Sequence, residues 1–288
     1  MADAIDTPPD VNNSLYHDDK FSCSSEKQQI LSDDLPPLDI VRKMIKYETF
    51  LRLSDPIQQL FELYHKDDNA ITMVLDLVQQ NVVEHFGYSH VNALRTAISR
   101  FPDDSIIKEA FYIKHNKITQ GLVNQGQCAL DVKLFTLDGE STTLFSQITS
   151  KQPLILFADF HLIKFNSFSK LVRSHTPAMR LLTIYIAEAH ARDQWPAGKT
   201  ISCVDQPKTL VERLENAREF KKKFNFEMPI LVDSMDNTFH ITYGSWPFRF
   251  YIINDGKLIL KAEPGITTYA YDLNELDTWI DNFYRDKK

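Results

Sequence analysis

The chain has 288 residues, 43% of them hydrophobic, so it is long enough for one sizeable domain and a smaller one, each with a buried core. Its 39 acidic residues outnumber its 32 basic residues, and the net charge of −7 argues against a nucleic-acid-binding surface. The apolar runs are far shorter than the ~20 residues needed to cross a bilayer, and the N-terminus lacks the features of a secretory signal. We therefore expect a cytoplasmic protein without a membrane anchor.

The cysteines are too few and too far apart to define a disulfide framework or a zinc site. Cys23, Cys128 and Cys203 form no C-x-x-C pair. We expect no metal site. We also expect Cys128 and Cys203 to be partly buried and to act as small hydrophobic residues.

The residue composition of the first part of the chain changes near residue 38. Residues 1–36 are rich in Asp, Ser, Asn and Pro and poor in large apolar groups, which predicts a disordered tail. Apolar residues then recur at helical spacing in four groups, at 40–51, 57–64, 71–82 and 91–98. This pattern predicts a small all-helical domain over 38–120, and the glycines of 121–126 indicate a joint to the next domain.

Beyond the joint the pattern becomes that of an α/β domain over 126–288. Alternating residues at 132–136 before the Asp138-Gly139 turn predict a hairpin, and apolar runs at 153–157, 181–186 and 230–232 predict buried strands. Further elements expected in chain order are helices at 165–172 and 210–224, a hairpin at 250–260 and a helix at 273–283. This order predicts a thioredoxin-like fold, with a mixed central sheet flanked by helices.

One motif points to a particular family. Residues 184–190 read Ile-Tyr-Ile-Ala-Glu-Ala-His and are followed by Asp193 and Trp195. This resembles the I-Y-I-E-E-A-H-x-x-D-x-W signature of the iodothyronine deiodinases, and weaker likeness extends over about 126–283. The resemblance implies an oxidoreductase that removes iodine from thyroxine-type aryl iodides without a bound cofactor. The expected partner is a small aromatic ligand or a thiol reductant, and a homodimer is a further option.

The nucleophile of that family is missing from its place. In deiodinases a selenocysteine or cysteine follows the first core strand, at the N-terminus of the next helix, where the helix stabilises its anion. Here residues 158–164 read Ala-Asp-Phe-His-Leu-Ile-Lys and contain no such residue. Two explanations stay open: a pseudo-enzyme that has kept the fold and lost the chemistry, or a UGA codon for selenocysteine that was omitted in translating the gene.

Three positions match residues that the family uses at its site, and two aromatic residues of the motif are candidates for a ligand slot. Glu188 and His190 correspond to the family's proton-transferring pair, which makes them the predicted catalytic residues. Arg249 matches an arginine that can hold a substrate carboxylate through two parallel hydrogen bonds. Tyr185 and Trp195 are predicted to line a slot for an aromatic ligand. The plainer alternatives are two surface polar residues, a salt bridge at the sheet edge and ordinary core packing, respectively.

Other positions qualify the resemblance. Pro247 precedes a predicted strand where thioredoxin-like folds often carry a cis-proline, so we predict a cis Trp246–Pro247 bond. Ala187 replaces a family glutamate, and Pro207 stands where a histidine helps to grip the substrate.

The sequence therefore predicts a deiodinase-like oxidoreductase that, as written, lacks its nucleophile. The alternative is a non-catalytic thioredoxin-fold protein that binds a ligand or a partner. A peroxiredoxin-like peroxidase is disfavoured because no cysteine follows the first core strand.

Overall fold

The computed structural model describes residues 31–67, 70–150, 152–159, 179–263, 272 and 274–285. Most of the predicted tail and the whole helix predicted over 165–172 lie outside the described residues. The same is true of most of the segment 158–164, where a nucleophile would stand.

The helical unit is built around three helices, α1 (Leu38–Leu53), α2 (Asp55–Phe61) and α3 (Ala70–His85). A 3-10 turn, η2 (Glu62–His65), follows α2, and four single-turn helices complete the unit: α4 (Asn92–Arg95), α5 (Ala97–Arg100), α6 (Ser105–Lys108) and α7 (Phe111–Lys114). Apolar residues at helical spacing on α1 and α3 meet in one core, as the periodicity predicted; they include Val41, Met44, Val82 and Val83.

Two details of this unit differ from the expectation. The helix predicted over 91–98 is split at Thr96, whose hydroxyl donates a hydrogen bond to the carbonyl of Asn92 and so competes with the helical backbone pattern. Residues 31–36 were expected in the disordered tail. Ser32 instead forms a bridge with Tyr88, because its backbone bonds to Gly87 and Ser89 just beyond the end of α3.

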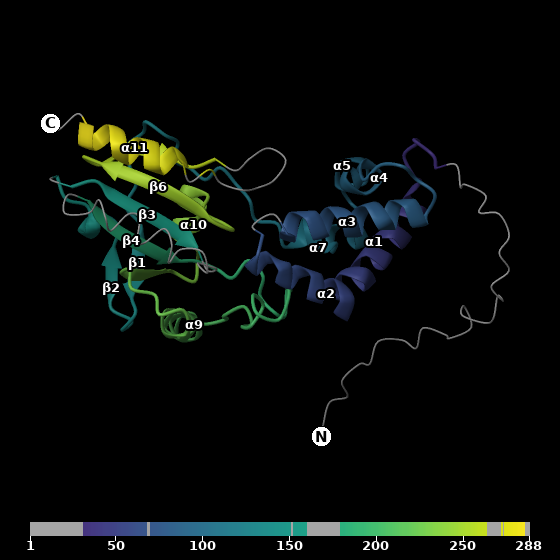
Figure 1. Ribbon diagram of the computed structural model, residues 1–288, viewed down its shortest axis with the longest axis horizontal. Coiled ribbons are helices and arrows are strands. Elements are labelled where there is room, and N and C mark those ends of the chain that lie inside the picture. Colours follow the sequence, from purple (N-terminus) through teal and green to yellow (C-terminus); the bar gives the residue numbers. More distant parts are fainter. Residues whose placement is uncertain are drawn as a thin grey trace, which may run out of the picture.

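The second unit is a seven-stranded sheet in the order β2-β1-β5-β4-β3-β6-β7 (Figure 1). The strands are β1 (Lys133–Thr136), β2 (Ser141–Thr143), β3 (Leu154–Asp159), β4 (Arg180–Tyr185), β5 (Ile230–Asp233), β6 (Arg249–Asn254) and β7 (Lys257–Lys261). β3, β4 and β5 run parallel, whereas β6 is antiparallel to β3. The predicted thioredoxin-like arrangement, with a mixed sheet and a closing hairpin, is confirmed.

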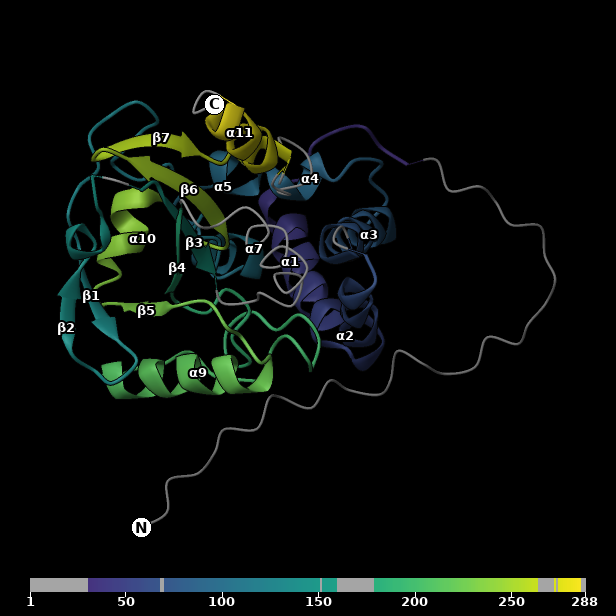
Figure 2. The same ribbon diagram turned by 60° about the vertical axis from the view of Figure 1, so that its left-hand side comes forward.

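Helices flank this sheet. α9 (Leu210–Lys223) lies beside β5 (Figure 2), and α11 (Asn274–Arg285) lies near β6 in both views (Figures 1 and 2) and near β7 in Figure 2. The sequence did not predict α10 (Thr238–Tyr243), whose first turn is capped by Asp233, since its carboxylate accepts hydrogen bonds from the backbone of Phe239 and His240 at 2.9 and 3.1 Å. No helix among the described residues combines the length and apolarity required to span a membrane.

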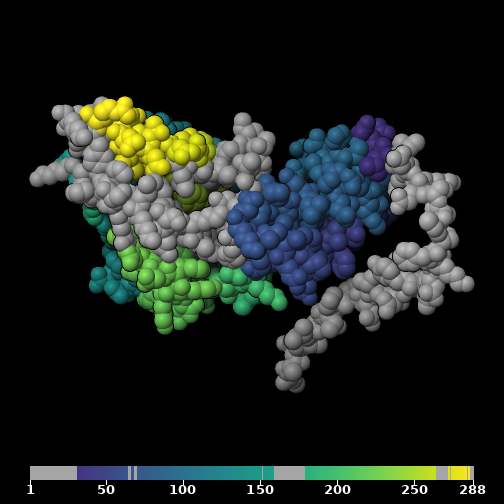
Figure 3. Space-filling model, viewed as in Figure 1, coloured from purple at the N-terminus to yellow at the C-terminus, as the bar shows by residue number. Residues whose placement is uncertain are grey.

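The joint between the units is packed rather than free. The backbone N–H groups of Leu122 and Val123 both donate to the carbonyl of Thr242, at 2.7 and 3.1 Å, and Lys261 Nζ donates to the carbonyl of Val123 at 2.9 Å. Figure 3 shows the blue helical unit as a lobe beside the teal-to-yellow sheet unit. The chain that joins the two lobes is therefore held against α10 and β7.

Candidate functional site

The predicted site residues lie where β3 and β4 end and β6 begins. Tyr185 is the last residue of β4, and Glu188 and His190 follow it in the loop 186–208. In the sheet register, Asp159 of β3 lies opposite Tyr185, and Ala158 of β3 lies opposite Arg249 of β6. The carboxyl ends of β3 and β4 and the beginning of β6 thus bring these residues together beside the segment that follows β3.

Glu188 is held in a buried network. The hydroxyl of Tyr185 donates to Glu188 Oε1, and Asn216 Nδ2 of α9 donates to the same oxygen at 3.3 Å. The side-chain amide of Gln206 bonds to both the N–H and the carbonyl of Glu188, at 3.1 and 2.8 Å. Burial, together with the charge of Glu188, raises the pKa of Tyr185 well above its ordinary value, so the phenol keeps its proton. A phenol that donates to a carboxylate is an arrangement that can pass a proton.

His190 is half-buried and neutral. Its Nδ1 lies 3.1 Å from the carbonyl oxygen of Trp195, and burial lowers its pKa to about 4. Because a carbonyl only accepts hydrogen bonds, Nδ1 carries the proton and Nε2 has the lone pair. His190 therefore has the protonation state of a base at neutral pH.

Arg249 is a fully buried cation with open hydrogen-bonding capacity. Its side chain is 0% exposed, and its Nη2 lies 3.6 Å from Glu263 Oε2, an ion pair longer than a hydrogen bond. Among the described residues, none of its three guanidinium nitrogens has a hydrogen-bond partner. Arg249 thus has the salt bridge of the plainer alternative, although its strand β6 lies between β3 and β7 and is not the outermost strand of the sheet. Buried donors without acceptors cost free energy, which favours an acceptor supplied from outside the described residues.

The two predicted aromatic residues are buried. Trp195 stacks on Trp246 with 6.1 Å between ring centroids and 15° between planes, and Tyr185 packs at 6.0 Å from Phe220. Core packing accounts for this burial, and a part in ligand binding stays a prediction. The Trp246–Pro247 peptide bond, for which the sequence predicted a cis conformation, is cis.

Several polar residues near this edge were not singled out from the sequence. His240 Nδ1 accepts a hydrogen bond from the Trp246 N–H at 3.1 Å, and burial, with the charges of Lys117 and Arg249, lowers the pKa of His240 to about 4. Burial raises the pKa of Asp233 to about 6. Asp233 directly follows the apolar run 230–232, and a carboxylate at the end of a buried strand is the signal that could have found it.

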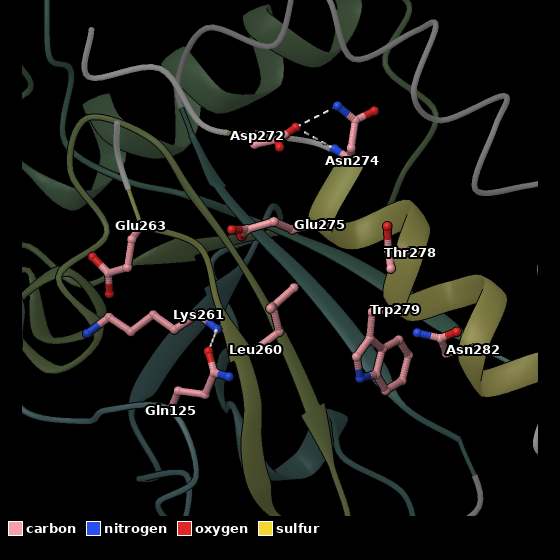
Figure 4. A pocket seen from close by; sticks show the side chains of 10 residues that line it. All are labelled: Gln125, Leu260, Lys261, Glu263, Asp272, Asn274, Glu275, Thr278, Trp279 and Asn282. Atoms are coloured by element: carbon pink, nitrogen blue, oxygen red, sulfur yellow. Dashed lines mark hydrogen bonds between the residues drawn. The ribbon is translucent and has the colours of Figure 1, made fainter. Parts of the chain in front are cut away.

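A cavity of about 530 Å³ lies elsewhere, between β7 and α11 (Figure 4). Lys261, Glu263 and Trp279 are among the residues that line it, and Glu263 links it to Arg249. Glu188 and His190 do not line it, so the cavity is separate from the predicted catalytic pair.

Two cysteines belong to the described residues. Cys128 and Cys203 are free and exposed, which corrects the expectation of partial burial: Cys128 bridges to Lys257 at the rim of the sheet, and Cys203 lies in the surface loop after Ile201. In the part of the chain that is described, no group of three His, Cys, Asp or Glu residues is placed to hold a metal ion.

The strand order, the cis-proline before β6 and the polar residues at the carboxyl ends of the parallel strands define a thioredoxin-like protein. The family profile described as iodothyronine deiodinase matches residues 93–284, well over half of the chain, and the chain belongs to this family. The match begins inside the helical unit, earlier than the resemblance found by motif.

Relatives of known activity agree with this assignment. The chain is 29% identical over 145 residues to the type I iodothyronine deiodinase of Xenopus laevis, covering 49% of this chain and 57% of the relative. It is 27% identical over 164 residues to the thyroxine 5-deiodinase of Gallus gallus, covering 55% and 62%. The aligned chain thus spans less than two thirds of these relatives. Among solved structures, a thiol peroxidase from Chromobacterium violaceum is similar with a TM-score of 0.40 and 12% identity, over 58% of this chain and 91% of that chain. The assignment of the fold class rests on the strand order and not on this similarity.

Proposed function

We propose that the chain binds an iodothyronine-type ligand, an aromatic molecule with a carboxylate, at the carboxyl edge of β3 and β4, and that as written it does not remove iodine from it. Family membership supports the ligand class, because the relatives are named as deiodinases of thyroxine type. The observation that carries the proposal is Arg249, a buried guanidinium with open donors opposite the end of β3.

A ligand carboxylate would satisfy this arginine better than its present partner does. Glu263 approaches to 3.6 Å and its side chain is 52% exposed, so it balances the charge without a hydrogen bond. A carboxylate that entered the site could accept two parallel N–H bonds from the planar guanidinium.

The deiodination step needs a group that residues 158–164 do not supply. In that reaction a selenolate or thiolate bonds to the iodine while the aryl–iodine bond breaks, and the electron pair left on the carbon takes a proton. A thiol then attacks the chalcogen and releases iodide, and a second thiol restores the nucleophile as the thiols are oxidised to a disulfide. The Tyr185–Glu188 pair and neutral His190 suit the proton transfer. Without the nucleophile the covalent path is closed.

Binding can be tested directly with thyroxine by titration calorimetry on the full chain. We expect Arg249→Met to weaken binding at least about tenfold, as loss of a charge-assisted pair does, and Arg249→Lys to retain part of the affinity. Arg192→Met is the matched control, since Arg192 forms an exposed ion pair with Asp205 in the loop that carries Glu188. Unaltered binding by Arg249→Met would overturn the proposal.

A second candidate is an active deiodinase whose selenocysteine codon was omitted from the written sequence. The assembled Tyr185–Glu188 pair favours it, because a phenol that donates to a carboxylate suits the proton transfer that the reaction requires. The mass of the native protein decides between the two. A mass above that of the written chain, with selenium present, supports the active enzyme, whereas the written mass supports a binding protein.

A further inference from the structure

A buried ion pair of the helical unit lies against the loop that carries the candidate site. Glu48 and Arg52 stand one turn apart on α1, and their side chains are 0% and 1% exposed. Arg52 Nε donates to Glu48 Oε1 at 2.9 Å, and the guanidinium carbon lies over the ring of Trp195, 5.8 Å from its centroid. Arg52 thus provides a cation–π contact between the two units.

This ion pair is costly for the fold. Glu48 Oε2 and Arg52 Nη1 are buried without a hydrogen-bond partner among the described residues. A buried pair with unsatisfied atoms is often no more stable than apolar residues of the same volume, so stability alone does not explain it. The contact that it makes with Trp195 offers another reason.

A second set of contacts anchors the loop just beyond Trp195. Gln58 of α2 donates through Nε2 to the carbonyl of Pro196 at 3.3 Å and accepts through Oε1 from the N–H of Gly198 at 2.9 Å. Glu62 accepts from the N–H of Thr200 at 2.9 Å. Ala197 packs in one apolar cluster with residues of α2 and α3, namely Phe61, Val74 and Val78. The helical unit therefore holds the backbone of residues 196–200 by side chains at defined positions.

Trp195 connects these contacts of the helical unit with the site residue His190. Its carbonyl accepts from His190 Nδ1, and its ring lies 5.4 Å from the imidazole of His190. The same ring stacks on Trp246, the residue before the cis-proline. One aromatic side chain thus contacts Arg52, His190 and Trp246.

We infer that Glu48, Arg52 and Gln58 are positioning residues: the helical unit completes the candidate site by seating Trp195 and, through it, His190. The helical unit therefore contributes to the geometry of the site. This inference deepens the proposed function and rests on the same site. Its test needs no ligand, so it can fail or succeed independently of thyroxine binding.

The experiment compares full-length variants by NMR titration of His190 and by the fluorescence of the stacked Trp195–Trp246 pair in a Trp279→Phe background. The double variant Glu48→Gln with Arg52→Met removes both charges at nearly constant volume, so no buried charge is left unpaired. We expect the emission of the tryptophan pair to move to longer wavelength. We also expect the titration midpoint of His190 to rise, because its pKa is held down mainly by burial and further by the charge of Arg52, and the double variant removes that charge. Arg52→Lys, which keeps the cation, should restore both signals toward wild type.

Two further variants keep the test decisive. Gln58→Ala removes the anchor of Pro196 and Gly198, together with a hydrogen bond to the backbone carbonyl of Arg52, but it keeps both charged side chains of the ion pair. It should shift the same His190 signals even if the double variant fails to fold. Arg42 lies on the same helix α1 and forms an ion pair with Asp104 at the N-terminus of α6. Arg42→Met breaks that ion pair and should change neither signal. Native His190 and tryptophan signals in a folded double variant and in Gln58→Ala would overturn the inference.

Discussion

Gly121 and Gly244 interlock where the chain passes from the helical unit to the sheet unit. A Cβ atom on Gly121 would lie 2.4 Å from the backbone nitrogen of Gly244, and one on Gly244 would lie 2.5 Å from the carbonyl oxygen of Thr119. Both residues have positive φ angles, 69° and 66°. The joint thus depends on two backbones that approach closer than any side chain permits.

We expect Gly121→Ala to lower the free energy of unfolding by at least about 3 kcal/mol, since it adds a backbone overlap to the strain of a left-handed residue. Gly126→Ala is the control, because Gly126 also has a positive φ of 87°, but a Cβ atom added there would meet no other atom within 4 Å. It should cost only about 1 kcal/mol. Urea unfolding of both variants measures the difference, and equal losses would contradict the packing at the joint.

Acid should destabilise the fold in part through His240. Its folded pKa of about 4 lies below the ordinary value of 6.5, so it contributes stability that is present above pH 6.5 and is lost as pH falls toward 4. His190 acts in the same direction. Asp233 acts in the opposite direction, since its raised pKa means that its contribution is present at low pH and is lost as pH rises through about 6.

The variant His240→Asn isolates the histidine. The amide oxygen of asparagine can accept the Trp246 N–H in place of Nδ1, and the titrating group is gone. Between pH 6.5 and 4 we expect the unfolding free energy of wild type to fall more steeply than that of the variant, by up to about 1.4 kcal/mol per pH unit. Urea unfolding at several pH values checks this, and parallel pH profiles would exclude a neutral His240.

The start of α9 should depend on its capping box. Thr209 Oγ1 accepts from the N–H of Glu212 at 3.2 Å, and Glu212 Oε2 accepts from the N–H of Thr209 at 3.1 Å. We expect Thr209→Ala to lower the unfolding free energy by about 1 kcal/mol. Thr200→Ala, at an exposed loop position that keeps its backbone bond to Glu62, should have a much smaller effect. Equal thermal shifts in the two variants would speak against the cap.

A recombinant protein of the written sequence should release no iodide from thyroxine in the presence of a dithiol, because residues 158–164 contain no cysteine or selenocysteine to open the covalent path. Iodide release is the measurement. The double variant Cys128→Ser, Cys203→Ser controls for the two exposed thiols. Release that survives in this variant would show that another group of the chain attacks iodine.

The sequence by itself determined the elements and their order. Continuous apolar runs predicted β3, β4 and β5 to within a residue or two, because a strand covered on both faces needs apolar side chains at every position. Apolar residues at helical spacing predicted α1, α3 and α9. The motif around Tyr185 and Glu188 indicated the family before any contact was known. Each of these signals lies within a stretch of neighbouring residues.

The tertiary structure alone decided the contacts between distant residues. The short helix α10 starts at the buried carboxylate of Asp233. Its six residues are too few to show a helical periodicity in the sequence. Arg52 and Trp195 are separated by more than a hundred positions, yet the cation lies over the ring. The burial of Arg249 with its donors open depends on its place beside Ala158 in the middle of the sheet. Periodicity reports which face of an element is apolar, whereas the partner of that face is chosen only when the whole chain packs.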